Sequence, residues 1–391
     1  MRVLNVVQLL DPQLGGGTVE RTLQMSRYLV RQGVECTVLT MEIALRVERT
    51  TALEGIEVVS LPCLNRRFHL PRTSLARVAE LVEAVDVIHL MNHWTAINAL
   101  VYRAARKQGR PYAICPAGAL PVAGRSRLLK RIYNAVIGRS IVRHADRMIA
   151  ISENEVADYL GYGGQAERVV LIPNGVDANE FVCNDRAGFL TRHGLPDRPF
   201  ILFVGRLNRI KGPDLLLRAF LALECRFSDW QLVLVGPDEG MRAELESLVS
   251  SSGVGGRVRF LGFLGGEEKS AAYHAAELLV IPSRREAMSI VALEAGICGT
   301  PVLLTDECGF SAVESTGGGR VVRATVGELQ AGLEEMLGIR PEARAAMGQR
   351  LRALVEREYR WEAVIRRYIG VYEELLRAQE GTAATSNPPE G

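Results

Sequence analysis

The sequence predicts an α/β protein with two doubly wound parallel-sheet domains that face each other across a cleft. Apolar stretches of strand length alternate with helical apolar spacing along most of the 391 residues, which is typical of parallel sheets covered by helices. The alternation is interrupted at the polar, irregular segment 183–198 and restarts at Phe200. Because this length exceeds one ordinary core, we predict an N-terminal domain at 1–182, a linker at 183–198 and a C-terminal domain at 199–358.

The composition is that of a globular protein. Hydrophobic residues make up 48%, charged residues 24%, and the net charge is +2, so we expect no nucleic-acid partner. Seven cysteines are scattered without a C-x-x-C pair, which favours free thiols in a reducing compartment and no zinc site. We find no signal-peptide pattern and no apolar run approaching about 20 residues. We therefore expect a cytoplasmic protein.

The first predicted strand, Val3–Leu10, leads into a glycine-rich loop at Asp11–Gly17 and a helix at Thr18–Arg31. The backbone at Gly16 and Gly17 can approach a ligand closely, although a tight turn explains these glycines as well. Further strands of this domain are predicted at Glu35–Met41, Ile56–Leu61, Asp86–Leu90, Pro111–Cys115, Arg147–Ile151 and Val169–Pro173, with helices at Thr73–Val85, Ala96–Gln108 and Arg127–His144.

Polar side chains follow two of these strands. Asn92 and His93 come after one strand, and Asn174 comes after another. Open parallel sheets bind ligands at the carboxyl ends of their strands, so these three residues are candidates for the acceptor side of the cleft. His89 lies inside an apolar strand and fits a structural role better.

The segment 125–147 interleaves Arg and Lys with Leu, Ile and Val. As an amphipathic basic helix it can contact an anionic membrane surface. A solvated arginine face on a core helix explains the pattern equally well. The chain closes with helices, of which those at 359–378 can return to the N-terminal domain, and with a tail at 379–391 whose composition predicts disorder.

In the C-terminal domain, the candidate functional residues lie in two turns, each of which follows a predicted strand. Arg206 and Lys211 lie in the turn after the strand Phe200–Val204 and together can neutralise a diphosphate. The segment 278–304 is read as strand, loop, helix and strand, with Ser289 as helix N-cap. The helix start is suited to an anion, and the carboxylates of Glu286 and Glu294 suit sugar hydroxyls.

These motifs, in this order, resemble the retaining nucleotide-sugar glycosyltransferases of group 1, or glycosyltransferase family 4, with the GT-B fold. The similar segments are GRLNRIKG, Glu286 and Glu294 with seven residues between them, the glycine loop followed by Glu20, DVIHLMNHW, IPNGVD and EAGICGTPVLL. The loop Ala287-Met288-Ser289 departs from the Gly-Phe-Gly of many relatives. The chain also has Pro116 where some relatives have a histidine, which leaves His93 as a substitute catalytic candidate.

The resemblance implies a role for each candidate. Arg206 and Lys211 would bind the donor diphosphate, assisted by the backbone of Met288, Ser289 and Ile290. Glu294 would bind the ribose, and Glu286 the transferred sugar. No Asp-x-Asp occurs, so we expect no metal and no other cofactor.

We therefore expect a retaining glycosyltransferase that moves a sugar from a nucleoside-diphosphate sugar to a glycan or lipid-linked glycan, in cell-surface polysaccharide biosynthesis at the inner membrane face. Two alternatives remain from the sequence. One is a sugar-nucleotide epimerase or hydrolase of the same fold. The other is a non-catalytic protein that binds sugar nucleotides.

Overall fold

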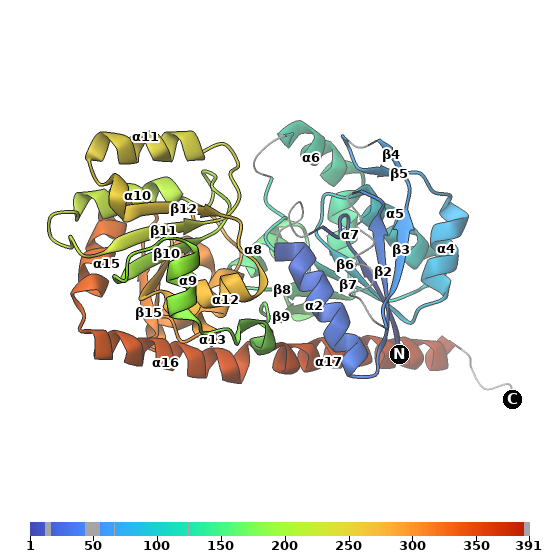
Figure 1. Ribbon diagram of the computed structural model, residues 1–391. Coiled ribbons are helices and arrows are strands. Elements are labelled where there is room, and N and C mark those ends of the chain that lie inside the picture. The colour runs from blue at the N-terminus through green and yellow to red at the C-terminus, as the bar shows by residue number, and fades with distance from the viewer. Residues whose placement is uncertain (12–16, 44–54, 66, 123–125, 387–391) are drawn as a thin grey trace, which may run out of the picture. The chain divides into compact units, whose positions relative to one another are not determined.

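A computed structural model describes residues 1–11, 17–43, 55–65, 67–122 and 126–386 (Figure 1). It has two compact units. Unit 1 comprises Met1–Asn174 and Trp361–Gly391, and unit 2 comprises Gly175–Arg360. Each unit contains a parallel sheet with helices, which confirms the predicted α/β class.

The sheet of unit 1 has seven strands in the order β3-β2-β1-β6-β7-β8-β9, all parallel. The central strands β6 and β7 are buried at every residue, as expected for strands covered on both faces. The strands are β1 Arg2–Val6, β2 Glu35–Met41, β3 Glu57–Leu61, β6 Val87–Met91, β7 Tyr112–Cys115, β8 Arg147–Ala150 and β9 Val169–Leu171, with an antiparallel hairpin of β4 Cys63–Asn65 and β5 Leu70–Pro71.

Two helices of unit 1 begin at ordinary capping residues. Ser74 and Thr95 accept hydrogen bonds from the first turns of α4 and α5, and Gly109 ends α5 in the left-handed conformation. The predicted basic helix is α6, a π-helical turn at Asn134–Gly138, and α7 in direct succession. The helices are α2 Gly17–Arg31, α4 Leu75–Glu83, α5 Ala96–Gln108, α6 Arg127–Tyr133, α7 Arg139–Arg143 and α8 Asn154–Gly161, with a 3-10 turn at Ala166–Arg168.

The sheet of unit 2 has six parallel strands in the order β12-β11-β10-β13-β14-β15. These are β10 Phe200–Val204, β11 Gln231–Val235, β12 Val258–Gly262, β13 Leu278–Ile281, β14 Val302–Thr305 and β15 Gly319–Val322. The helices are α9 Arg186–Arg192, α10 Pro213–Ala222, α11 Arg242–Ser252, α12 Gly266–Ala275, α13 Ile290–Ile297, α14 Ala312–Ser315, α15 Val326–Gly338 and α16 Pro341–Glu358, with 3-10 turns at Ala178–Phe181, Gly255–Arg257 and Asp306–Cys308.

The structure differs from the predicted boundaries in three places. Unit 2 begins at Gly175, because Val176 donates a backbone hydrogen bond to Tyr359 and forms a bridge with Arg360. The predicted linker contains α9, which is capped by Asp185. The last helix, α17 Trp361–Ser386, continues past Ala378 into the predicted disordered tail, and Gln379 donates to the carbonyl of Gly109 at 3.1 Å.

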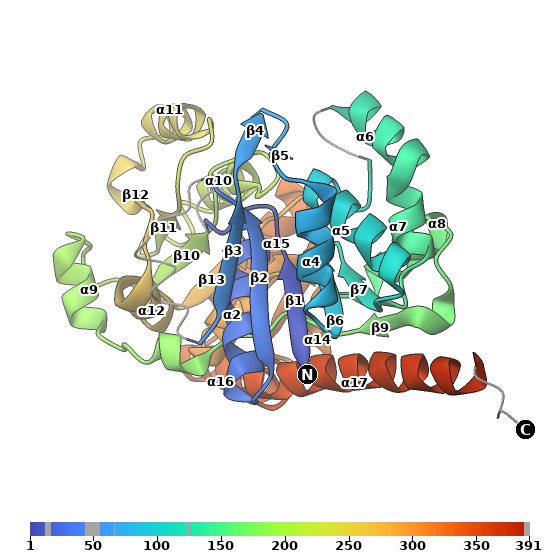
Figure 2. The same ribbon diagram turned by 90° about the vertical axis from the view of Figure 1, so that its right-hand side faces the viewer.

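Helix α17 returns to unit 1 and packs on α2 and β6. Its first residue, Trp361, stacks on Tyr28 with the ring centroids 6.1 Å apart. Arg21 of α2, which is 1% exposed, donates to Asn174 at 3.1 Å and also to Tyr368 of α17. The buried guanidinium therefore joins the end of the unit's first segment to the helix that closes the chain. Figure 2 shows α17 running along the base of the unit, at the end where β1 begins.

Gly212 lies at the start of α10 with a left-handed φ of 68°, and a Cβ there would collide with the carbonyl of Pro282. Gly253 has a similar φ of 76° in open space. We predict that Gly253→Ala lowers the free energy of unfolding by about 1 kcal/mol through backbone strain alone. Gly212→Ala adds the collision and costs about 2 kcal/mol more. Urea unfolding measures both, and equal losses would show that the contact with Pro282 imposes no constraint.

Candidate functional site

The carboxyl ends of β10 and β13 bring Lys211 and Glu286 together. The two strands are hydrogen-bonded neighbours, and the loops that follow them carry these two residues. Lys211 Nζ lies 2.6 Å from Glu286 Oε1, and the side chains are only 22% and 13% exposed. Ser283 Oγ donates to the other carboxylate oxygen at 3.1 Å. Both oxygens of Glu286 are therefore engaged.

A second ion pair holds the loop of Glu286 against α10. The guanidinium of Arg284 donates to both oxygens of Asp214, at 2.8 and 2.6 Å, and also to the carbonyl of Arg209 at 2.7 Å. Burial acts to raise the pKa of Asp214, whose side chain is 4% exposed, but the hydrogen bonds from Arg284 outweigh it and hold that pKa below its usual value. Neither Arg284 nor Asp214 was predicted from the sequence, although Asp214 follows Lys211 by only three positions.

Arg206 does not join the Lys211–Glu286 pair. Its guanidinium donates to Glu239 Oε1 at 2.9 Å, and Asn208 donates to the other oxygen at 2.6 Å. The Asn208 side-chain oxygen in turn accepts from the backbone N–H of Lys211 at 2.9 Å. Asn208 therefore links the partner of Arg206 to the backbone of Lys211. Arg206 remains 43% exposed.

Glu294 lies in the second turn of α13 and is held by two residues of α12. Lys269 Nζ lies 2.9 Å from Oε1, and the Tyr273 hydroxyl donates to Oε2 at 2.5 Å. Burial and the carboxylate keep the pKa of Tyr273 well above its ordinary value, so the hydroxyl stays a donor. Lys269 and Tyr273 could not be predicted from the sequence, because no spacing along the chain relates α12 to α13.

The start of α13 differs from the prediction in one respect. Ser289 is the N-cap and its hydroxyl accepts from Ala292 at 3.4 Å, as predicted. Its own backbone N–H, however, donates to the carbonyl of Cys308 at 3.0 Å, so this group is not available to a ligand in this conformation. Met288 is 5% exposed. The N–H of Ile290, in the first turn, has no partner within a regular helix.

His93 is fully buried in unit 1. Its ring packs against Trp94, Tyr162 and Tyr133, at centroid distances of 4.6, 5.2 and 5.6 Å. Nε2 lies 3.1 Å from Asn134 Oδ1 in the π-helical turn. Burial lowers the pKa of His93 to about 4, although the bond with Asn134 opposes the shift. The imidazole is therefore neutral at neutral pH.

The other candidates of unit 1 lie around α2. Gly17 is the first residue of that helix, and Gly16 falls outside the described residues. Asn92 has a left-handed φ of 63° and accepts from Thr18 at 3.4 Å, while Asn174 is buried and accepts from Arg21. His89 is buried as expected for a structural residue, with Nδ1 2.5 Å from the Tyr372 hydroxyl.

Within the described segments, no helix has both the length and the apolar character that a bilayer span requires. Among the described residues, no three His, Cys, Asp or Glu side chains lie close enough together to hold a metal ion.

We predict that Asp214→Asn lowers the free energy of unfolding by about 2 kcal/mol at neutral pH, because Arg284 loses a charged partner. A carboxyl whose pKa is depressed by folding contributes stability above its unfolded pKa and loses it as the pH falls through the folded pKa. The difference between wild type and variant should therefore shrink below about pH 4. Urea unfolding at several pH values measures this, with Asp229→Asn, at an exposed position, as control. A difference that is constant with pH would contradict the assignment.

Two family descriptions match the chain. Residues 190–353 match "Glycosyl transferases group 1", and residues 16–175 match "Glycosyl transferase 4-like domain". A D-inositol 3-phosphate glycosyltransferase of Actinosynnema mirum is 32% identical over 317 residues, which cover 74% of this chain and 75% of the relative. The D-inositol 3-phosphate glycosyltransferase 1 of Catenulispora acidiphila is 31% identical over 322 residues, which cover 74% of this chain and 74% of the relative.

Solved structures of similar fold include the Anabaena protein Alr3699/HepE in complex with UDP and glucose. Its TM-score is 0.77 at 20% identity, covering 96% of this chain and 100% of that one. Sucrose-phosphate synthase from Thermosynechococcus elongatus has a TM-score of 0.72 at 22% identity, covering 97% and 100%. With the family matches, this likeness confirms the fold expected from the motifs. The chain belongs to the group 1 glycosyltransferases, family 4, with the GT-B fold.

Proposed function

We propose that the protein transfers a sugar from a nucleoside-diphosphate sugar to a glycan or lipid-linked glycan, with retention of configuration and without a metal ion or cofactor. The observation that carries this proposal is the Lys211–Glu286 pair, 2.6 Å apart at the ends of neighbouring strands. The Lys211 cation suits the diphosphate of such a donor, and the Glu286 carboxylate suits the hydroxyls of its sugar. The Anabaena protein of similar fold has been solved with UDP and with UDP-glucose, which supports this donor class.

The residues of unit 2 account for the departure of the diphosphate. Breaking the bond between the sugar C1 and its phosphate oxygen leaves negative charge on the diphosphate and an oxocarbenium-like sugar. Lys211 and Arg206 stabilise that charge, assisted by the N–H of Ile290 and the dipole of α13. Glu286 accepts hydrogen bonds from the sugar, and Glu294 from the ribose. The acceptor oxygen attacks C1 on the face that the diphosphate leaves and gives its proton to the departing oxygen.

Donor binding must rearrange two side chains. Lys211 exchanges Glu286 for a phosphate, so Glu286 is released to the sugar hydroxyls at the same moment. Arg206 turns from Glu239 to the diphosphate, which its 43% exposure permits. We assign Asn92 and Asn174 of unit 1 to the acceptor and Gly16 and Gly17 to the donor. For His93, a catalytic candidate from the sequence that lies buried against aromatic rings, we propose a positioning role at the π-helical turn.

We further propose that unit 1 meets an anionic membrane on the cytoplasmic face, where a lipid-linked glycan for cell-surface polysaccharide would be available. Four apolar side chains form one stripe along α6 and the π-helical turn; Leu128, Leu129, Ile132 and Val136 are 50–70% exposed. Arg127 and Arg131 are exposed beside this stripe, which suits anionic lipid. Both ribbon views show the β4–β5 hairpin, which carries exposed Leu64, projecting from the same end of the unit (Figures 1 and 2).

We predict that Glu286→Ala and Lys211→Ala each lower acceptor-dependent transfer by at least about 10²-fold, because each removes a group that acts in the transition state. The matched controls are Glu267→Ala and Lys107→Ala, both at exposed positions, and both should remain near wild type. Release of nucleoside diphosphate is measured with and without an acceptor. Release or epimerisation without acceptor would instead favour the alternative enzymes, and no turnover with any donor would favour a binding protein.

We predict that Ile132→Ser with Val136→Ser weakens binding to vesicles containing anionic lipid by about thirtyfold, since each exposed side chain loses roughly 1 kcal/mol of apolar burial and every 1.4 kcal/mol is a factor of about ten. Leu160→Ser, on α8 and 46% exposed, is the control and should bind as wild type. Flotation with the vesicles measures binding. Equal binding by all three proteins would remove the membrane contact.

A further inference from the structure

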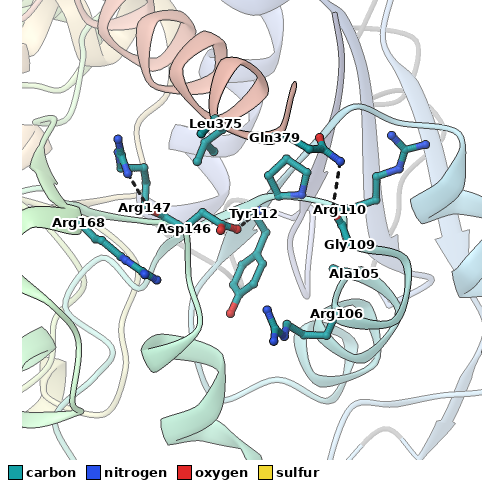
Figure 3. Close-up of a pocket in the computed structure, with 12 residues that line it drawn as sticks. Ala105, Arg106, Gly109, Arg110, Tyr112, Asp146, Arg147, Arg168, Leu375 and Gln379 are labelled. Carbon is teal, nitrogen blue, oxygen red and sulfur yellow. Dashed lines mark hydrogen bonds between the residues drawn. The ribbon is translucent and has the colours of Figure 1, made fainter. Parts of the chain in front are cut away.

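We propose that unit 1 has a second ligand site, specific for small molecules that carry phosphate groups, at the amino ends of β7, β8 and β9. A pocket of about 340 Å³ lies there, beneath α17 (Figure 3). Its position separates it from the candidate acceptor residues Asn92 and Asn174, which follow the carboxyl ends of β6 and β9. The pocket lies within unit 1 and shares no residue with the proposed donor site.

Four arginines line this pocket, namely Arg106, Arg110, Arg147 and Arg168. Two carboxylates oppose them. Asp146 accepts from the backbone N–H of Tyr112 at 2.9 Å, and Glu374 pairs with Arg147 at 3.3 Å. The pocket therefore retains an excess of positive charge. The dipole of α5 explains basic residues in its last turn, but it does not explain why Arg147 and Arg168 from other elements meet them.

Arg106 and Arg168 are best placed to bind an anion. Figure 3 shows the two guanidinium groups extending toward Tyr112 from different sides. The side chain of Arg106 makes no hydrogen bond or ion pair with any residue that the structure describes. Arg168 donates to the carbonyl of Ala145 at 3.2 Å through one nitrogen, which leaves further donors. Both side chains act to lower the pKa of the neighbouring Tyr112, although burial raises it overall.

The size and the walls of the pocket indicate the kind of ligand. Planar guanidinium groups bind carboxylate and phosphate alike through two parallel hydrogen bonds. A phosphate group carries more negative charge and more acceptor oxygens than a carboxylate, which suits a pocket lined by several arginines. The volume is at the lower end of the range of small-molecule sites, about 300–1,000 Å³. The Tyr112 ring and Leu375 supply apolar surface beside the cations. A phosphorylated sugar or a similarly small organic phosphate fits these requirements.

Helix α17 forms one wall of the pocket through Leu375 and Gln379. Gln379 donates to the carbonyl of Gly109, and Arg147 of β8 pairs with Glu374 of α17. A bound phosphate would contact Arg147 and join the sheet to α17 more firmly. Because the ligand requires the folded site, binding should raise the unfolding temperature of the whole protein.

The site is tested by calorimetric titration with inorganic pyrophosphate. The parent protein carries Lys211→Ala, which weakens the proposed donor site, and the arginine variants described next assign the remaining binding to the pocket. We expect one binding site and weaker affinity when the ionic strength rises from about 50 to 200 mM. Adding Arg106→Gln with Arg168→Gln should weaken binding by at least about tenfold, because both charged partners are lost. Arg103→Gln, an exposed change on the same helix, should leave it unchanged.

Hydrogen exchange of the same proteins locates the ligand. Protection should appear at 105–112 and 145–147, and should be absent from the double variant. Should the double variant unfold, Arg106→Gln alone serves, because this exposed residue can be changed without loss of the fold. The proposal fails if the parent does not bind pyrophosphate, or if the Arg106 and Arg103 variants bind it equally well.

Discussion

The contact between Lys211 and Glu286 is the constraint on which the proposed donor site depends. Two opposite charges that are mostly removed from water must stay paired, because an unpaired one would cost several kcal/mol. The pair is possible only because β10 and β13 are neighbours and because Gly212 brings α10 close to the carbonyl of Pro282. Asp214 and Arg284 fix the same two loops. A donor with phosphate at one end and hydroxyls at the other can replace both partners at once, so neither charge is left unpaired.

The same principle organises the rest of the molecule. Glu294 is only 7% exposed, and Lys269 and Tyr273 engage both of its oxygens, which fixes the carboxylate. In unit 1 the buried Arg21 binds Asn174 and Tyr368. The end of the chain is thereby anchored on the unit in which the chain begins. In both units, buried charged side chains thus connect segments that are distant in the sequence.

Much of the fold and of the candidate site could be predicted from the sequence. The features that could not be predicted have a common cause. Buried strands are continuous apolar runs, and the carboxyl ends of parallel strands share one edge, so the loops of Lys211 and Glu286 were located correctly. The partners of Arg206 and Glu294 depend on how helices and loops pack, which spacing does not encode. His93 follows its strand as expected, but Tyr133 and Tyr162, far along the chain, cover it. The helix beyond Ala378 was missed because its polar residues suggested disorder.

Nucleoside diphosphate without the sugar provides the most direct test of the central pair. If Lys211 binds the diphosphate and Glu286 the sugar, Lys211→Ala should weaken binding of the diphosphate by about tenfold or more. Glu286→Ala should leave this binding equal or tighter, because Lys211 no longer has a competing carboxylate. Calorimetric titration of the two variants with the preferred nucleoside diphosphate decides the matter. Equal losses in both variants, or no loss in Lys211→Ala, would contradict the account.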